Sequence, residues 1–199
     1  TAIGLGMIPL IRSAPQPREV LDSYINLYLE REVQQEGLVR NVDDFARFLE
    51  TICFSQGNLV TVSDIARECE VKRTTVGGFI SIAEDLLIAK LVPVFQKRSR
   101  RRLVKHRKFY YFDCGLFAAL RPFGPLDRKQ ELAGPALEGL VFQHIQAWID
   151  YSRNNSKLFF WRTSTGLEVD FVVYGEEQFA AIEVKNSTTV RSKELSGLR

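Results

Sequence analysis

What this 199-residue sequence lacks excludes several classes of protein. No apolar run reaches the roughly 18 residues that a membrane-spanning helix needs, and no signal-peptide pattern is present, so we expect a cytoplasmic protein without membrane contact. The cysteines Cys53, Cys69 and Cys114 are isolated and odd in number, which fits a reducing compartment without disulfides. Two histidines and no paired cysteines make a structural zinc site unexpected. No glycine is followed by lysine, so a phosphate-binding P-loop is absent.

The sequence also has no initiating methionine, and it stops at Ser196-Gly197-Leu198-Arg199 without an obvious terminator. We therefore expect it to be a piece of a longer protein. At 45% apolar and 11% aromatic residues, the piece can still bury a core of its own.

Charge is nearly balanced overall but unevenly distributed. The chain has 27 Lys and Arg against 24 Asp and Glu, a net charge of +3. Residues 97–108 hold eight of these bases and no acid, which leaves 19 bases and 24 acids, a net charge of −5, in the rest. This distribution excludes a basic coat over the whole protein and predicts an acidic body with one dense basic segment.

Apolar spacing predicts helices in the first half of the chain, followed by a hairpin. The expected elements are helices at 18–33 and 42–52, a short apolar piece at 59–62, a compact helix around Ile65, a longer helix at 76–89, and strands at 91–95 and 109–112. Pro93 confines the first strand to a sheet edge. Helix, turn, helix and a hairpin with a basic loop is the element order of a winged helix-turn-helix. Gly77 and Gly78 weaken the second helix, so we expect a neighbouring helix to approach their backbone closely.

The last third of the chain is predicted to be one long helix followed by strands. The helix is predicted to begin near Gly134-Pro135 and to end near Tyr151, because proline suits a first turn. Strands are predicted at 157–161, 168–173 and 179–184. The chain as a whole is therefore expected to be α+β.

Carboxylates within these strands are the most informative residues. Asp170 lies in a β-branched and aromatic run, and Glu183 and Lys185 share one face of the next strand. A hairpin turn centred on Glu176-Glu177 sets Asp170 opposite Glu183, with Cβ atoms about 5 Å apart. Two carboxylates this close repel each other, and a divalent metal, or more weakly Lys185 alone, would relieve the repulsion.

Glu138 is a further candidate on the long helix. Phe142, Ile145 and Ile149 follow it at helical spacing, so Glu138 shares their apolar stripe. An acid in that place lies either at the rim of the core or buried with a partner.

Glu, Asp and Glu-x-Lys across a helix and two strands resemble the motif set of the PD-(D/E)XK nuclease-like superfamily. The resemblance implies that Asp170 and Glu183 hold Mg²⁺, that Lys185 orients or activates the attacking water, and that Glu138 completes the catalytic site. Val169 stands where the motif has proline, a position that varies within the superfamily.

A wider motif order is similar to that of an uncharacterised C-terminal domain in prokaryotic AAA-type ATPases. The matching motifs are residues 28–32, the expected winged helix, residues 108–116, residues 137–141, Phe160-Trp161-Arg162, residues 168–171 and residues 182–185. This resemblance implies an ATPase module outside the chain, which would bind ATP and support homo-oligomers. It implies a linker and helix at 1–36, a winged helix-turn-helix domain at 37–113 and a nuclease-like domain at 114–199 that is incomplete at its C-terminus.

DNA is the partner expected for the basic segment, whose eight bases repel one another and should point to water. The residues expected to bind nucleic acid are Lys72, Arg73, Lys97, Arg98, Arg100, Arg101, Arg102 and Lys105. Alternatives remain open: a solvated loop, an acidic protein partner, or a non-catalytic module that regulates the ATPase and whose acidic residues are an enzyme relic.

Overall fold

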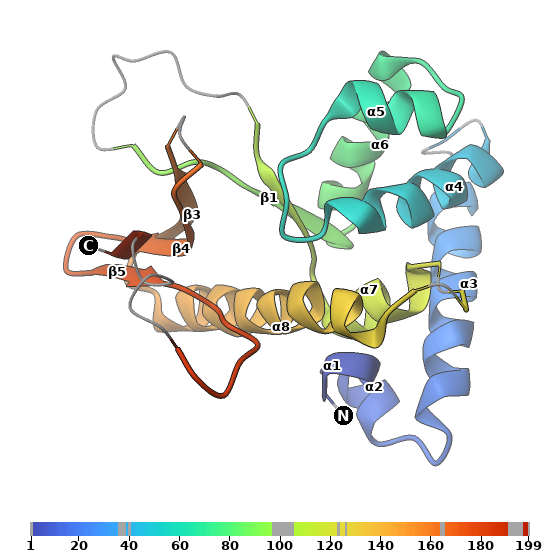
Figure 1. Cartoon of the computed structure of the whole chain (residues 1–199). Coiled ribbons are helices and arrows are strands. Elements are labelled where there is room, and N and C mark those ends of the chain that lie inside the picture. The colour runs from blue at the N-terminus through green and yellow to red at the C-terminus, as the bar shows by residue number, and fades with distance from the viewer. Residues whose placement is uncertain are drawn as a thin grey trace.

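Helices and two small antiparallel sheets make up the computed structural model of this chain (Figure 1). The structure describes residues 2–35, 39, 41–96, 106–122, 124–125, 127–163, 166–190 and 197–198. The helices are α1 (Ala2–Leu5), α2 (Pro9–Arg12), α3 (Pro17–Gln35), α4 (Val42–Ile52), the 3-10 helix η1 (Cys53–Ser55), α5 (Val62–Glu68), α6 (Arg73–Asp85), α7 (Cys114–Leu120) and α8 (Lys129–Ser152). The strands are β1 (Ala89–Val92), β2 (Lys108–Tyr111), β3 (Lys157–Arg162), β4 (Glu168–Tyr174) and β5 (Phe179–Ile182). The predicted α+β class is confirmed.

The larger hydrophobic core lies among helices α3 to α7. Asn41 caps α4 by accepting hydrogen bonds from the amides of Asp43 and Asp44, and the apolar stripe of α4 then faces inward. Phe45 and Phe48 on that stripe pack against Phe79 of α6, with ring centroids 5.3 and 5.5 Å away. This packing fixes α6 against α4 and leaves the opposite face of α6 toward solvent.

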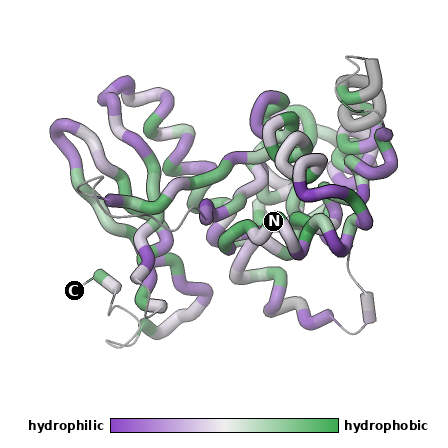
Figure 2. The backbone as a smooth tube through the Cα atoms, turned by 90° about the horizontal axis from the view of Figure 1, so that it is seen from above, coloured by the Kyte–Doolittle hydropathy of each residue, from purple (hydrophilic) through white to green (hydrophobic). Residues whose placement is uncertain are grey.

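The smaller core lies between α8 and the C-terminal sheet, and the hairpin β1–β2 joins the two cores. Phe109 and Tyr111 face the larger core, whereas Tyr110, between them on β2, faces the smaller one. Figure 2 shows the result as two lobes, with the C-terminal sheet on one side and most helices on the other. Because β2 is buried on both faces, the hairpin is the structural bridge between the lobes.

The hairpin follows α6 as predicted, with Ala89 paired to Tyr111 and Val92 to Lys108. Pro93 ends β1, since it has no amide hydrogen for the ladder. The chain then runs beside β3, where Phe95 donates its amide to the Phe160 carbonyl at 2.6 Å. The predicted strand at 91–95 is therefore divided between two sheets.

The C-terminal sheet has the order β3–β4–β5. Phe171 pairs with Ile182 and Tyr174 with Phe179, and the Gly175 amide donates to the Gln178 carbonyl at 2.9 Å across a two-residue turn. This is the predicted register, in which Asp170 and Glu183 are the next opposed pair.

Three sequence predictions about helices are wrong. The helix predicted at 76–89 is α6, which spans Arg73–Asp85, and Ala89 already belongs to β1. Helix α8 begins at Lys129, so Pro135 lies inside it rather than in its first turn. No described atom lies within 4 Å of a Cβ added at Gly77 or Gly78, and both residues are exposed. The expected neighbouring helix is therefore not found there among the described residues.

Asp113 joins the N-terminal segment to both α7 and α8. Its buried carboxylate caps α7 through the Gly115 amide at 2.8 Å and accepts from the Met7 amide at 2.7 Å and Gln143 Nε2 at 2.9 Å. A side chain at Gly6 would collide with this carboxylate, so glycine is required there. In the part of the chain that the structure describes, no helix is both long enough and apolar enough to cross a bilayer.

Candidate functional site

A buried lysine lies among three acidic residues, two of which, Glu138 and Asp170, were singled out from the sequence. Lys108 Nζ is 2.5 Å from Glu168, 3.3 Å from Glu138 and 3.5 Å from Asp170, and its side chain is 2% exposed. Tyr110 adds a hydroxyl that donates to Glu138 Oε1 at 2.5 Å. We call Lys108, Tyr110, Glu138, Glu168 and Asp170 the acidic centre.

Strand and helix periodicity bring these groups together. Lys108 and Tyr110 are two residues apart, so both point from β2 toward the smaller core. Glu168 and Asp170 have the same spacing on β4, and Glu138 projects from α8. The backbone at Gly57, with φ of +70°, passes so close to the Glu138 carboxylate that an added Cβ would lie 3.1 Å from it.

Sequence reasoning found Glu138 and Asp170 but missed Lys108, Tyr110 and the central role of Glu168. The prediction that all eight bases of residues 97–108 point to water is wrong for Lys108, because its ammonium neutralises buried carboxylates. A signal was present: Lys108 stands two residues before Tyr110 in an apolar run, which gives both residues the same face of a strand.

Burial and neighbouring charges raise the pKa values of three groups in the acidic centre. Burial alone disfavours the Lys108 ammonium, but the attraction of Glu138, Glu168 and Asp170 outweighs it, so the pKa of Lys108 is raised. Burial also raises the pKa of Glu138, although Lys108 opposes that rise. The pKa of Tyr110 lies well above its usual value because of burial and the neighbouring carboxylates. Lys108 is therefore a permanent cation at neutral pH and Tyr110 a hydrogen-bond donor.

The second part of the predicted site lies beside the centre. Val184 donates its amide to Asp170 Oδ2 at 2.8 Å, and Lys185 donates to Glu183 Oε1 at 2.5 Å. The other oxygen of Glu183, Oε2, is buried and has no hydrogen-bond partner among the described residues. Arg162 pairs with Glu168 at 3.4 Å.

The remaining open oxygens decide whether a Mg²⁺ ion would fit. Asp170 places one oxygen 3.5 Å from the Lys108 ammonium and accepts the Val184 amide with the other, so a metal ion at Asp170 would compete with that ammonium. Glu183 is the other predicted ligand, and its Oε2 is buried without a hydrogen-bond partner among the described residues. Across the described ranges, no three His, Cys, Asp or Glu side chains are arranged to hold a metal. As folded, the centre fits a lysine ammonium rather than Mg²⁺, and Mg²⁺ on Asp170 and Glu183 stays a prediction.

Of the residues predicted to bind nucleic acid, Lys72 and Arg73 are exposed where α6 begins. Arg107, the base that precedes Lys108, is exposed as well. The rest of this set lies outside the described residues: Lys97, Arg98, Arg100, Arg101, Arg102 and Lys105.

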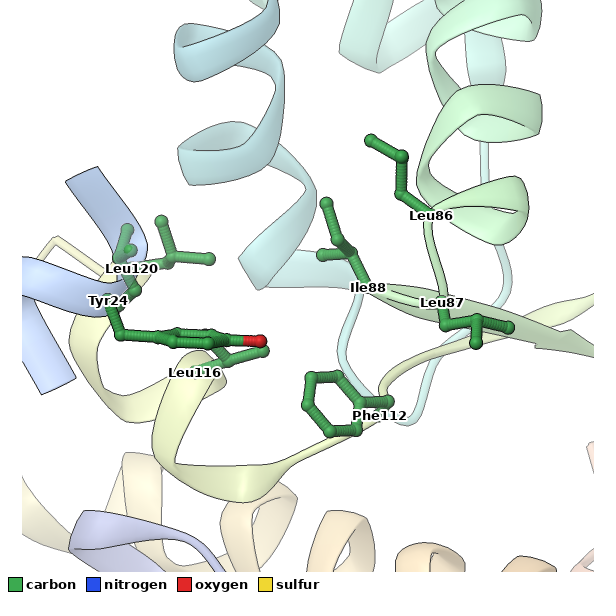
Figure 3. A pocket seen from close by; sticks show the side chains of 8 residues that line it. Tyr24, Leu86, Leu87, Ile88, Phe112, Leu116 and Leu120 are labelled. Carbon is green, nitrogen blue, oxygen red and sulfur yellow. The ribbon is translucent and has the colours of Figure 1, made fainter. Parts of the chain in front are cut away.

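A separate apolar cavity of about 320 Å³ lies between α3, the α6–β1 turn and α7 (Figure 3). Tyr24 lies over Leu116 on one side, and Ile88 and Phe112 lie on the other. The lining residues carry no charge, so the cavity contains no acid, base or cation that would support chemistry.

Comparison with known proteins gives related sequences but no related solved structure. The uncharacterized proteins Mb2031c of Mycobacterium bovis and Rv2008c of Mycobacterium tuberculosis are each 27% identical over 172 residues, which is 84% of this chain. The chain spans 38% of the length of these two relatives. No solved structure matches.

Family models cover most of the chain in two parts. Residues 133–199 match a domain of unknown function, DUF4143. Residues 5–127 match another domain of unknown function, DUF8612. Since the second match covers more than half of the residues, the chain belongs to the DUF8612 family.

Proposed function

We propose that this chain is a nucleic-acid-binding, non-catalytic region of a longer ATPase-type protein. The observation that carries this proposal is the hairpin β1–β2, which follows α5 and α6 directly and whose connecting residues 93–107 hold seven bases and no acid. Gln56 and Leu59 also contact β2 through single isolated backbone bridges, to Phe109 and Lys108. Two helices followed by such a sheet support a winged helix-turn-helix.

The exposed face of α6 supports the same role. Lys72 and Arg73 stand at its start, and Gly77 and Gly78 leave the backbone open one turn later. Positive side chains at the start of an unobstructed helix suit contact with a phosphate backbone.

The acidic centre supports a structural rather than a catalytic role for the C-terminal part. A helix packed on an antiparallel sheet, with Asp170 and Glu183 in opposed positions, supports kinship with the PD-(D/E)XK superfamily. The Lys108 ammonium, however, stands among the carboxylates that a metal would need. The lysine of the bridging hairpin and the acids of α8 and β4 then hold the hairpin against the C-terminal lobe.

The longer protein would supply the ATP chemistry. The two mycobacterial relatives are more than twice as long as their matching part, which leaves room for an ATPase module. The resemblance to AAA-type proteins supports that module and its homo-oligomers. We propose that this chain docks such an assembly onto DNA.

DNA affinity measured against salt tests the proposal. Changing Arg100, Arg101 and Arg102 together to Ala should weaken duplex binding and reduce the slope of log affinity against log salt by about 1 for each phosphate that the variant no longer neutralises. The control is the matched triple change of three exposed arginines elsewhere, Arg12, Arg18 and Arg128, to Ala. Equal affinity and equal slope in the two triple variants would contradict nucleic-acid binding by the basic segment.

Mg²⁺-dependent phosphodiester cleavage is the second candidate, favoured by the open Glu183 Oε2. A plasmid-nicking assay with Mg²⁺ or Mn²⁺ compares the wild-type chain with Asp170→Ala. We expect background activity in both. Nicking by the wild type that disappears in the variant would establish the nuclease function instead.

A further inference from the structure

The outer face of the C-terminal sheet carries an exposed aromatic cluster. Along β3, Leu158 and Phe160 are buried toward α8, so Phe159 points from the opposite face. Phe95 packs on that outer face, with its ring centroid 5.6 Å from Phe159, 5.2 Å from Tyr174 and 5.9 Å from Phe179. Tyr174 is 47% exposed and Phe179 is 67% exposed.

Hairpin stability alone does not require this much exposed aromatic surface. Tyr174 and Phe179 are directly opposed across β4 and β5, and that contact contributes to the register. The two-residue turn already sets the same register, however, and both rings leave much of their surface in water. Exposed aromatic clusters of this kind serve as contact surfaces.

Nearby charge indicates the kind of partner. Phe95 stands two residues before Lys97, the first base of residues 97–108, and Lys157 is exposed opposite Tyr174. Glu176 and Glu177 occupy the turn that directly joins Tyr174 to Phe179, so a polyanion is favoured on the side of the cluster where Phe95 and Lys157 lie and disfavoured over the turn. Exposed aromatic rings with a cation beside them, here Lys157, suit unpaired bases, which stack on the rings while their phosphates contact basic side chains.

We propose that Phe95, Tyr174 and Phe179 form a stacking surface for the unpaired bases of single-stranded DNA. This inference rests on the proposed nucleic-acid binding and specifies its substrate class. Duplex DNA keeps its bases stacked inside the helix and gains nothing from these rings. The chain therefore prefers a single strand, or a junction where a duplex opens.

Binding of labelled oligo(dT) and of a duplex, each about 20 nucleotides long, tests the inference. Tyr174→Ala and Phe179→Ala should each weaken oligo(dT) binding about tenfold and leave duplex binding within about twofold of wild type. Tyr151→Ala removes an even more exposed aromatic ring (86%) on α8, which packs on the opposite face of the sheet, and should change neither affinity.

Phe179→Leu and Phe179→Trp separate stacking from folding. Leucine keeps apolar packing but removes the ring. The Phe179→Leu variant should therefore bind oligo(dT) as weakly as Phe179→Ala, while its melting temperature stays near that of the wild type. Tryptophan should retain oligo(dT) binding, and its added fluorescence should be quenched by the bases. Unchanged oligo(dT) affinity in the Tyr174 and Phe179 variants, with wild-type binding intact, would overturn the stacking surface alone. Absence of any binding by the wild type would overturn the proposed function as well.

Discussion

The ammonium of Lys108 lies 2.5 Å from a carboxylate oxygen of Glu168, and the two residues come from different sheets of the molecule. Lys108 belongs to the hairpin that follows α6, whereas Glu168 begins the central strand of the C-terminal sheet. The Lys108 ammonium thus neutralises carboxylates of β4 and α8 where the hairpin packs against the C-terminal sheet. The arrangement links the stability of the C-terminal lobe to the basic hairpin.

Lys108→Met should destabilise the protein by about 3–5 kcal/mol, because it leaves three partly buried carboxylates without their common cation. Urea unfolding measures the loss. Lys90→Met, which removes an exposed lysine of the same hairpin, is the control and should have little effect. Equal stability of the two variants would show that Lys108 does not hold the centre together.

Removing Lys108 should also create affinity for a divalent cation. In Lys108→Ala, Glu138, Glu168 and Asp170 surround the space that the ammonium has vacated, and hard cations bind clustered carboxylates. Millimolar Mg²⁺ or Ca²⁺ should therefore raise the melting temperature of the variant but not of the wild type. A rise of equal size in the wild type would mean that the ammonium does not exclude metal.

Local pattern predicts much of this fold because the relevant rules act over short distances. The Asp170–Glu183 opposition follows from a two-residue turn and the period of two along a strand. The stripe through Glu138 and Phe142 follows from helical spacing. The register that would oppose Asp170 to Glu183 is confirmed from Phe171–Ile182 to Tyr174–Phe179, and Phe142 lies in the smaller core as the stripe predicts. Both features depend on residues close together in the sequence.

Long-range placement explains what local pattern missed. Lys108 looks like the last base of a solvated run until β2 is buried between two cores, 30 residues before Glu138 and further still from Glu168. Whether a lysine in such a run faces water or acids depends on which surfaces cover its strand. The exposure of α6 at Gly77 could not be predicted from the sequence either. Glycine lowers the intrinsic stability of a helix, but it does not indicate whether another element packs against that position.

Glu138→Gln should change how stability depends on pH. Burial raises the pKa of Glu138 above its ordinary value of 4.5, so the folded protein holds this proton more tightly than the unfolded chain. That contribution is complete below the unfolded pKa and is lost as pH rises through the folded pKa. Glutamine does not titrate, so the unfolding free energy of the variant minus that of wild type should increase with pH over this window and then level off. Urea unfolding between about pH 4 and pH 8 measures the difference, and a decreasing one would contradict the assignment.

Asp113→Ala should destabilise the protein by about 3 kcal/mol, because three donors lose a buried charged acceptor. Asp113→Asn keeps one acceptor oxygen and should lose less. Since Met7 and Gln143 both depend on this carboxylate, the N-terminal helices should detach first. Limited proteolysis checks this order: cleavage before residue 17 should accelerate more in the alanine variant than cleavage in α8.

Glu70→Gly should stabilise the protein by about 1 kcal/mol. Helix α5 ends in a Schellman arrangement, in which the Val71 amide donates to the Ala66 carbonyl at 3.0 Å and Glu70 adopts a left-handed φ of 57°. Glycine takes that conformation without the steric strain of a Cβ, and the exposed Glu70 side chain contributes no hydrogen bond or ion pair among those described. Leu87 has the same conformation after α6, but it lines the apolar cavity, so Glu70 is the cleaner test. The melting temperature should rise by about 2–4 °C in Glu70→Gly, and Glu70→Ala, which keeps the Cβ, should not reproduce the rise. If alanine stabilised as much as glycine, the gain would come from removing the carboxylate and not from relief of backbone strain.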